Sequence, residues 1–483
     1  MKKVFLPLIV AFMSSQLSAQ TYNVLHNFPG NSRDGYAPAS SLVSDGTTLY
    51  GTTISGGRGG NGTIFRIDMN GSNYAVIKNF TNSEGANPGA GMVLSSGVLY
   101  GTTESGGSAG NGTAFMVNTD GTGYGVLKNF PATVPSFGGT NGDGYKPTGD
   151  LILDNGILYG TTSGGGAAGN GTVFKLNTDG FGFTVLKTFS STYQGTNNVS
   201  LSLLIRGTNS DGAKPAAGLV LGGSTLYGTT FSGGTSSNGV VFNVQTDGTG
   251  FAVLKYFSGL TNPPGFPYGT NSDGANPRAG LALSGDTLYG MTVNGGALFD
   301  GTIFKLTTNG TGFAVLKNYY SDDGAWPYNT LLIDGHTLYG ACFGGISNKG
   351  VVFRTDTSGS NYSVLKYMSP PDGFYSYSRL ILSSNQLYGT TYYGGTNNSG
   401  VVFALTVQPQ ILAGDGSFGV RSNAFGFNVT GVSNQIVIIE ASSNLTGSAW
   451  LPLQTNMLDG SADCFLDPAW TNFPTRFYRV RTQ

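Results

Sequence analysis

Seven copies of the tripeptide Leu-Tyr-Gly run through this 483-residue chain at nearly regular intervals. Successive copies are 50, 59, 68, 62, 50 and 49 residues apart. Their tyrosines are Tyr50, Tyr100, Tyr159, Tyr227, Tyr289, Tyr339 and Tyr388. A period near 50 residues, with several strand-length apolar runs in each unit, is typical of a β-propeller, whose blades are four-stranded sheets.

Each unit contains four runs that we predict to be strands a, b, c and d. In one unit they begin at Ala279 ("AGLALS"), Thr287 ("TLYGMTV"), Gly301 ("GTIFKLT") and Phe313 ("FAVLKNY"). Asn-Gly or Asp-Gly pairs between c and d supply the positive φ angles that tight hairpins need. The strands are more continuously apolar than strict alternation allows, which indicates burial on both faces.

The two ends of the repeat region complement each other. The seventh unit supplies strands a, b and c, beginning at Arg379, Gln386 and Gly400, but no strand d. "YNVLHNF" (Tyr22 to Phe28) matches strand d, although no a, b or c precedes it. We therefore predict an all-β chain whose residues 20–407 form a seven-bladed β-propeller closed by its N-terminal strand, which removes exposed sheet edges.

The first 19 residues have the pattern of a secretory signal peptide. Two lysines precede an apolar run from Val4 to Met13, and the small residues Ser18 and Ala19 follow. Cleavage near Ala19 predicts a secreted, periplasmic or cell-surface protein. No later segment approaches 18 consecutive apolar residues, so we predict no membrane span in the mature chain.

The period stops after the seventh unit. Residues 408–417 are predicted to be a linker. Residues 418–483 contain short apolar runs between turn residues, such as "FGFNVTG", "QIVIIEAS" and "RFYRVR", which predict a small β-sandwich.

Charge and cysteine content exclude several classes of protein. Of 24 basic residues, 22 remain after removal of Lys2 and Lys3, against 25 acidic residues. Such a surface is unsuited to nucleic acid, which needs clustered lysine and arginine. The two cysteines, Cys342 and Cys464, lie in different predicted domains, and we expect both to be buried free thiols. We expect a monomer.

The repeat resembles a known family. "LYGTT-x-SGG", then "NGT-[IV]-F" and "T-D-G-T-G-[FY]-x-V-L-K-x-F", are similar to the GloVer-type tandem repeat of secreted bacterial choice-of-anchor β-propeller proteins. The resemblance covers Tyr22 to about Val407 and implies extracellular or surface residence, with no established reaction. The C-terminal segment resembles the immunoglobulin- or fibronectin-like module that ends many secreted bacterial proteins.

Every d–a connection, which joins strand d to strand a of the next unit, carries an acidic residue before a glycine. These residues are Asp34, Glu84, Asp143, Asp211, Asp273, Asp323 and Asp372. Because d–a and b–c loops share one rim, we expect the carboxylates around the channel mouth. There they could bind a hard cation or act as acid–base groups. We favour a turn role, in which the carboxylate accepts backbone N–H bonds.

The remaining regular features favour structure over chemistry. The strand-c phenylalanines are predicted to pack between blades. They are Phe65, Phe115, Phe174, Phe242, Phe304, Phe353 and Phe403. His26 and His336 have no nucleophile or zinc-type spacing nearby. We expect no cofactor and no metal site.

Three consecutive d–a connections are longer than the others and extend one side of the same rim. With three of the rim carboxylates, their aromatic and cationic residues are the candidate ligand-binding residues. These are Phe137, Tyr193, Arg206, Phe266, Tyr268, Asp143, Asp211 and Asp273. Aromatic faces beside polar groups suit the faces and hydroxyls of sugars. Alternatively, these loops only pack over the blade junctions.

Three functions remain open. The first is a secreted or cell-surface binding or adhesion module that contacts an extracellular polysaccharide or surface protein through the long loops. The second is a polysaccharide lyase or hydrolase that uses the Asp, Tyr and Arg residues of the rim. The third is an envelope protein with no ligand. Fold does not decide between them, and we favour a non-enzymatic role.

Overall fold

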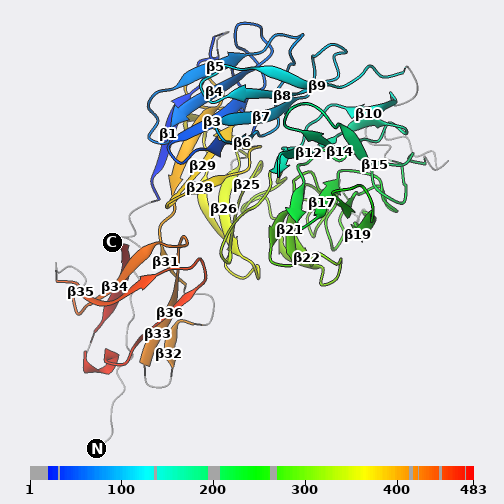
Figure 1. The fold of residues 1–483 in the computed structure, drawn as a ribbon. Helices are drawn as coiled ribbons and strands as arrows, with labels where there is room; N and C mark the ends of the chain where they lie inside the picture. Colours follow the sequence, from blue (N-terminus) through cyan, green and yellow to red (C-terminus); the bar gives the residue numbers. More distant parts are fainter. Residues whose placement is uncertain are drawn as a thin grey trace, which may run out of the picture.

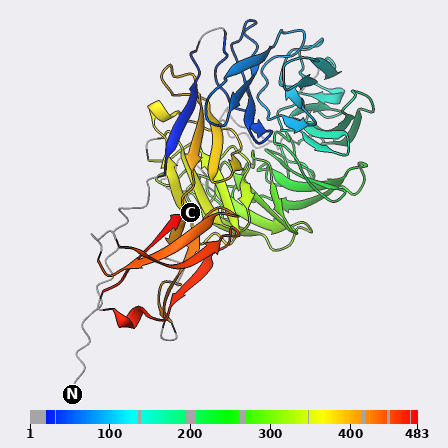
Figure 2. The same cartoon turned by 60° about the vertical axis from the view of Figure 1, so that its left-hand side comes forward.

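The protein is described from a computed structural model. The model describes residues 20–30, 33–134, 139–193, 207–261, 269–346, 348–412, 417–421, 424–444, 449–473 and 475–483. Within these residues the repeat region forms seven four-stranded antiparallel sheets, numbered sheets 1 to 7 below. In Figure 2 the colour runs once around a ring from blue through green to orange, so sheet 7 lies beside sheet 1.

The strands of each sheet follow the order a, b, c, d, and Figure 1 labels many of them. Sheets 1 and 2 contain β2 (Val43–Ser44), β3 (Thr48–Thr53), β4 (Thr63–Asp68) and β5 (Ala75–Asn79), then β6 (Val93–Ser95), β7 (Val98–Thr103), β8 (Thr113–Asn118) and β9 (Gly125–Asn129). Sheets 3 and 4 contain β11 (Ile152–Asp154), β12 (Ile157–Thr162), β14 (Thr172–Asn177) and β15 (Thr184–Thr188), then β16 (Val220–Gly222), β17 (Thr225–Thr230), β18 (Val240–Gln245) and β19 (Ala252–Tyr256).

Sheets 5 to 7 repeat the pattern. Sheets 5 and 6 contain β20 (Ala282–Ser284), β21 (Thr287–Thr292), β22 (Thr302–Thr307) and β23 (Ala314–Asn318), then β24 (Leu332–Asp334), β25 (Thr337–Cys342), β26 (Val351–Asp356) and β27 (Ser363–Tyr367). Sheet 7 contains β28 (Ile381–Ser383), β29 (Gln386–Thr391), β30 (Val401–Thr406) and β1 (Tyr22–Asn27). Outside the sheets, β10 (Asn141–Tyr145) pairs with β13 (Gly164–Gly166), and a short 3-10 helix spans Pro370–Asp372.

The N-terminal strand occupies the d position of sheet 7. β1 pairs antiparallel with β30, with Tyr22 opposite Leu405 and Asn27 opposite Val401. The register shifts by one residue between Val24 and His26, as it does in the c–d pair of every other sheet. The first strand of the chain therefore completes its last repeat sheet with the geometry that the other six sheets use.

Aromatic side chains fill the junctions between neighbouring sheets. At the first junction, Phe28 of sheet 7 packs edge-to-face on Phe65 of sheet 1, with ring centroids 5.4 Å apart. Tyr74, at the start of the next strand d, lies 5.8 Å from Phe65. The seven strand-c phenylalanines are fully buried, so the packing role predicted for them is confirmed. Edge-to-face aromatic pairs stabilise beyond the area that they bury.

The C-terminal unit consists of two small sheets. One contains β31 (Gln410–Leu412), β32 (Gly419–Arg421), β33 (Ala424–Thr430) and β36 (Asp463–Asp467), and the other contains β34 (Ile436–Ser442), β35 (Leu451–Met457) and β37 (Phe477–Thr482). A 3-10 helix, Trp470–Asn472, precedes β37. Phe427 and Ile439, one from each sheet, are buried in one shared core.

Two expectations for this unit are wrong. Residues 410–412, expected to lie in a linker, form β31 and pair with β33, because Ile411 packs on the core of the C-terminal unit. Cys464 is exposed rather than buried, since alternate residues of β36 face solvent, whereas Cys342 is buried as expected. No helix among the described residues is long and apolar enough to cross a membrane.

Candidate functional site

Two adjoining cavities lie inside the ring of sheets. The first, the rim cavity, has a volume of about 540 Å³ and is lined by d–a loops and the ends of b strands. The second, the axial cavity, has a volume of about 830 Å³ and is lined by the a strands of all seven sheets. The residues that line both cavities are Ser41, Asp150, Gly218, Gly280, Thr330 and Arg379. We call these residues, together with Gly91, the collar.

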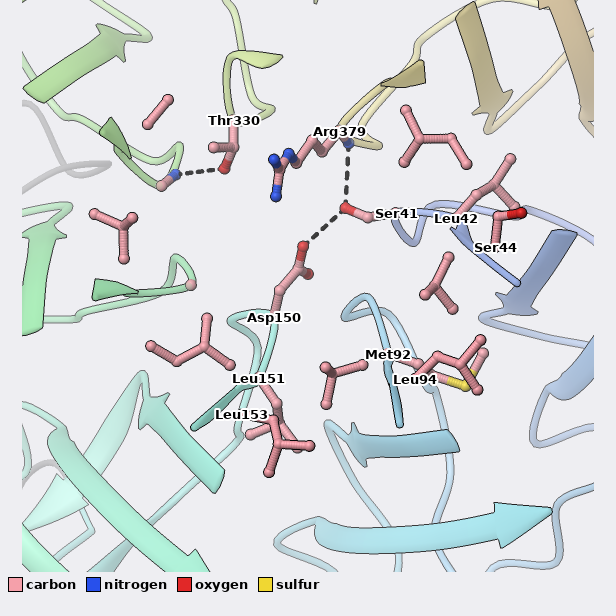
Figure 3. Close-up of a pocket in the computed structure, with 18 of the residues that line it drawn as sticks. Ser41, Leu42, Ser44, Met92, Leu94, Asp150, Leu151, Leu153, Thr330 and Arg379 are labelled. Carbon is pink, nitrogen blue, oxygen red and sulfur yellow. Dashed lines mark hydrogen bonds between the residues drawn. The ribbon is translucent and has the colours of Figure 1, made fainter. Parts of the chain in front are cut away.

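Each collar residue occupies the same place in its repeat, three positions after the proline of the d–a loop or after Ser376, which replaces that proline. Hydrogen bonds link several of the collar residues to one another (Figure 3). Ser41 Oγ donates to Asp150 over 2.8 Å, and the Gly91 N–H donates to the same carboxylate over 2.6 Å. The Arg379 N–H donates to Ser41 Oγ over 3.2 Å. The collar is therefore a ring of mostly small residues with one long cation.

A second set of residues, one in each d–a loop, has an unusual backbone conformation. The residue before the proline position has φ between 51° and 61° in every repeat. These residues are Ala37, Asn87, Lys146, Lys214, Asn276, Trp326 and Tyr375. A non-glycine residue in this left-handed region costs about 1–3 kcal/mol and persists only where its surroundings enforce it.

Hydrogen bonds between sheets enforce this conformation. The Tyr375 N–H donates to the Lys349 carbonyl of the preceding sheet over 3.2 Å, and the Tyr375 carbonyl accepts from Tyr392 N over 3.0 Å. Lys214 makes the equivalent bonds to Asn170 and Phe231. The backbone at the mouth is fixed in the same way in each repeat, so the repeats differ there mainly in their side chains.

Aromatic residues gather on one side of the mouth, over sheets 6 and 7. Phe343 and Tyr375 stack face to face with ring centroids 3.5 Å apart. Tyr377 lies 5.4 Å from Tyr328 and 5.5 Å from Tyr392. On sheets 1 to 4 the positions equivalent to Tyr377 carry small residues, which are Ala39, Gly89, Thr148 and Ala216. The mouth of the rim cavity is therefore asymmetric. Aromatic side chains on sheets 6 and 7, which we call the aromatic wall, face small side chains on sheets 1 to 4.

The charges at the mouth are mainly positive. Arg278, on sheet 5, lies over the rings of Tyr328 and Phe231, with its guanidinium carbon 5.2 Å and 5.8 Å from their centroids.

Burial raises the pKa of Tyr377 to about 12. The pKa of Tyr392 is also raised by burial. Both hydroxyls are therefore protonated at neutral pH and can donate hydrogen bonds to a ligand.

The three candidate carboxylates lie elsewhere. Asp143, Asp211 and Asp273 each pair with the lysine of the preceding strand d, at 2.5, 2.6 and 2.6 Å. None of them is among the described residues that line either cavity. They were expected around the channel mouth, but their lysines lie on the outer strand of each sheet and hold them there.

Two of these carboxylates, Asp211 and Asp273, also fix the base of a long loop. Asp211 accepts hydrogen bonds from Ser190 N and Ser190 Oγ, which lie 21 residues earlier in the chain. Asp273 makes the same two bonds to Ser258, 15 residues earlier. These bonds match the turn role that we favoured over acid–base chemistry. Among the described residues, no three His, Cys, Asp or Glu side chains come together as a metal site.

Only one candidate aromatic of the long loops can be placed. Tyr193 is 69% exposed, and its backbone exchanges hydrogen bonds of 2.7 and 3.0 Å with Thr208 at the base of the loop. Phe137, Arg206, Phe266 and Tyr268 lie outside the described residues.

Sequence reasoning missed the residues that face the cavities. Arg278, Asp150 and Arg379 are single substitutions within the repeat rather than insertions, so they do not appear as differences in repeat spacing. A usable signal exists: at the collar position the other repeats carry Ser, Gly, Gly, Gly and Thr, so an Asp and an Arg stand out.

Comparison with solved structures finds distant likenesses. The tricorn protease is 9% identical with a TM-score of 0.37, over 88% of this chain and 32% of that one. TolB from Acinetobacter baumannii is 10% identical with a TM-score of 0.37, over 66% and 63%. An ulvan lyase, a polysaccharide lyase bound to a GlcA–Rha3S saccharide, is 10% identical with a TM-score of 0.44, over 78% and 94%.

These likenesses carry no conclusion about activity. This chain spans less than two thirds of the length of the tricorn protease and of TolB. Among curated proteins, no sequence matches it.

A family-level match is stronger. The sequence model of the Gloeobacter/Verrucomicrobia repeat matches residues 11–203 and 265–448, which is more than half of the chain. The tandem-repeat resemblance seen in the "LYGTT" units is thereby confirmed. This chain belongs to the Gloeobacter/Verrucomicrobia repeat family.

Proposed function

We propose that this protein is a secreted or cell-surface module that binds an extracellular glycan at the rim cavity. In this proposal its repeat region is a seven-bladed β-propeller closed by β1. The pairing of β1 with β30, in the register used by the other c–d pairs, supports closure. The C-terminal unit acts as an immunoglobulin-like spacer or second contact.

The observation that carries the proposal is the aromatic wall of the mouth. Tyr328, Tyr377 and Tyr392 line the rim cavity and are only partly buried. Phe343 and Tyr375 belong to the same cluster, because Phe343 packs against both Tyr375 and Tyr377. Sugars present apolar faces and a dense ring of hydroxyls, which aromatic rings and protonated phenols can contact together. A cavity of this size also falls within the usual range for small-ligand sites.

The long d–a loops belong to the same rim. Their bases pair with b–c loops, as in the bridge between Ala213 and Ser232. Exposed Tyr193 stands on the second of the three loops. A polymer seated in the mouth would therefore pass beside these loops, as the sequence-based hypothesis requires.

Retention of the purified protein on insoluble polysaccharides tests the proposal. Tyr377→Ala and Tyr392→Ala are expected to lower retention roughly tenfold each, the usual effect of removing a central aromatic contact. Phe181→Ala is the matched control, because Phe181 is 74% exposed in a c–d turn and lines neither cavity. Retention that is equal for all three variants would refute binding at the mouth.

The same experiment addresses the long loops and the enzymatic alternative. Tyr193→Ala lowers retention only if the second loop contacts the glycan. Release of soluble, shorter polysaccharide chains during the incubation would favour a lyase or hydrolase over a binding module.

A further inference from the structure

Cationic side chains outnumber carboxylates in the rim cavity, although the whole chain has a formal net charge of −1. The cations are Lys146, Lys214, Arg278 and Arg379, and the carboxylates are Glu104 and Asp150. Lys146 Nζ lies 3.7 Å from Glu104, so these two charges compensate each other. The excess of positive charge is therefore local: it arises at positions that face the cavity and not from the overall composition.

Arg379 provides the most specific cation. Its backbone is fixed by the bond to Ser41, while its side chain is exposed and extends into the space between Thr330 and Asp150 (Figure 3). Asp150 lies across the collar, but its carboxylate accepts bonds from Ser41 and Gly91, and no ion pair joins it to Arg379 in the described structure. A guanidinium that is exposed inside a cavity, without a carboxylate partner, is suited to an anionic ligand.

Arg278 provides a second cation, which lines the rim cavity but not the axial cavity. It follows the proline of its d–a loop and therefore stands two positions before the collar residue Gly280. Its contacts with Tyr328 and Phe231 hold the guanidinium against two aromatic faces. It forms no ion pair within the part of the chain that the structure describes, and its side chain is exposed. Stacking of this kind orients a guanidinium while leaving its N–H edge available.

We propose that the rim cavity binds a saccharide that carries an anionic group, either a carboxylate or a sulfate. Arg278 and Arg379 bind the anion, and the sugar ring packs on Tyr377 and Tyr392. This inference rests on the glycan binding proposed above and adds the chemical class of the glycan. Both anions present a pair of oxygen atoms that a guanidinium can bind through two parallel N–H···O hydrogen bonds.

Calorimetric titration of the full-length protein with matched ligand pairs tests this inference. Galacturonan oligosaccharides are compared with the same oligosaccharides after reduction of their carboxyl groups, and dextran sulfate is compared with dextran. We expect at least one charged ligand to bind roughly tenfold or more tightly than its neutral counterpart. Raising the salt concentration should weaken only the charged ligands.

Substitution of the two arginines locates the effect. Arg278→Gln and Arg379→Gln are each expected to lower affinity for the charged ligand roughly tenfold and to leave affinity for the neutral ligand unchanged. Arg66→Gln is the control, because Arg66 is exposed on β4 and lines neither cavity. Unchanged melting temperatures verify that the variants are folded.

The possible failures are distinguishable. Equal affinity for charged and neutral ligands overturns this inference but leaves glycan binding standing. Preference for charged ligands that survives both arginine substitutions overturns the assignment of the site. Absence of binding to every glycan overturns the proposed function, and this inference with it.

Discussion

One residue of β1 departs from its six counterparts. The other d strands carry a lysine that pairs with the acid of the following d–a loop, as in Lys78–Glu84 at 2.7 Å. β1 carries His26 at this position, stacked on Tyr74 with ring centroids 3.6 Å apart. Its Nε2 atom is buried and has no hydrogen-bond partner among the described residues. Burial lowers the pKa of His26 from 6.5 to about 4, against a smaller opposing effect of Asp34.

The first prediction concerns acid stability. Because His26 binds a proton more weakly in the folded state, folding loses stability as the pH falls from about 6.5 towards 4. At pH 5 the loss should be about 2 kcal/mol. His26→Lys should remove it by restoring the ammonium group of the other sheets. Urea unfolding at pH 7.5 and 5.0 measures the effect, and equal pH dependence in the two proteins would contradict it.

The second prediction concerns the outer carboxylates. The side chains of Lys255 and Asp273 are only 22% and 9% exposed, so removing one charge leaves the other buried without a partner. Asp273→Asn should destabilise the protein by about 2–4 kcal/mol. Removing the lysine as well, in Lys255→Met/Asp273→Asn, should recover part of that loss. Denaturant unfolding measures both, and glycan retention should be unchanged.

Lys146→Met provides the reference for this pair. Its ion pair with Glu104 is about half exposed, with side chains 53% and 44% accessible, so its loss should cost less than about 1 kcal/mol. An equal cost at the two pairs would argue against a structural role for Asp273.

At the scale of elements, β1 is the strand whose removal should affect the stability of the fold most. Phe28 is fully buried between sheets 7 and 1, and the Phe28 N–H donates to the Gly400 carbonyl over 3.1 Å. Deletion of Tyr22–Phe28 should expose the edge of β30 and yield an aggregating or much less stable protein. Size-exclusion chromatography and thermal unfolding check this. A truncated protein that stays monodisperse and melts like the intact one would contradict the role of β1.

Strands were predictable because their signal repeats. Strands b, c and d of the unit beginning at Ala279 lie within one residue of the predicted starts, because Asn-Gly turns and apolar runs act locally. Strand a was placed too early: β20 begins at Ala282, since the Gly280 N–H bonds to Thr330 of the next sheet instead. That bond depends on ring geometry, which single units do not encode.

The site was less predictable for the same reason. Arg278, Tyr328 and Tyr377 belong to three successive repeats and come into contact only when sheets 5, 6 and 7 pack side by side. Each of them looks like an ordinary variation of the repeat when it is viewed alone. The inserted loops were visible as length differences, so they attracted the functional hypothesis. When the repeats are aligned by the proline position, Asp150 and Arg379 differ from the Ser, Gly and Thr residues of the other repeats.

At the scale of the whole molecule, the C-terminal unit contacts the a–b turn of sheet 6. His336 N and Thr337 Oγ1 donate to the Gly460 carbonyl, and the Ser433 N–H donates to Asp334 over 2.8 Å. Gly335 and Gly460 pack so closely that a Cβ atom on residue 335 would lie 3.0 Å from the Gly460 Cα. Figure 1 shows the orange-to-red unit beside the yellow sheets.

Gly335→Ala should therefore loosen the contact between the two units. Gly285→Ala is a matched control, because Gly285 occupies the same turn of sheet 5 with φ of 57°, against 55° at Gly335, and has open space around it. Both variants incur about 1–2 kcal/mol of backbone strain. Small-angle scattering should show a larger radius of gyration for Gly335→Ala alone, and identical curves would contradict the contact.

The pairing of β1 with β30 also orders events in time. Asn27 Oδ1 accepts a hydrogen bond from Thr396 N, a residue 369 positions later. Because a ribosome makes the chain from its N-terminus, the first strand must wait without a partner until almost the whole ring has been synthesised. Contacts so distant in sequence form slowly, and a waiting strand is open to wrong partners. β1 is therefore exposed to wrong partners for longer than the d strands of the other six sheets, which pair with a strand made just before them.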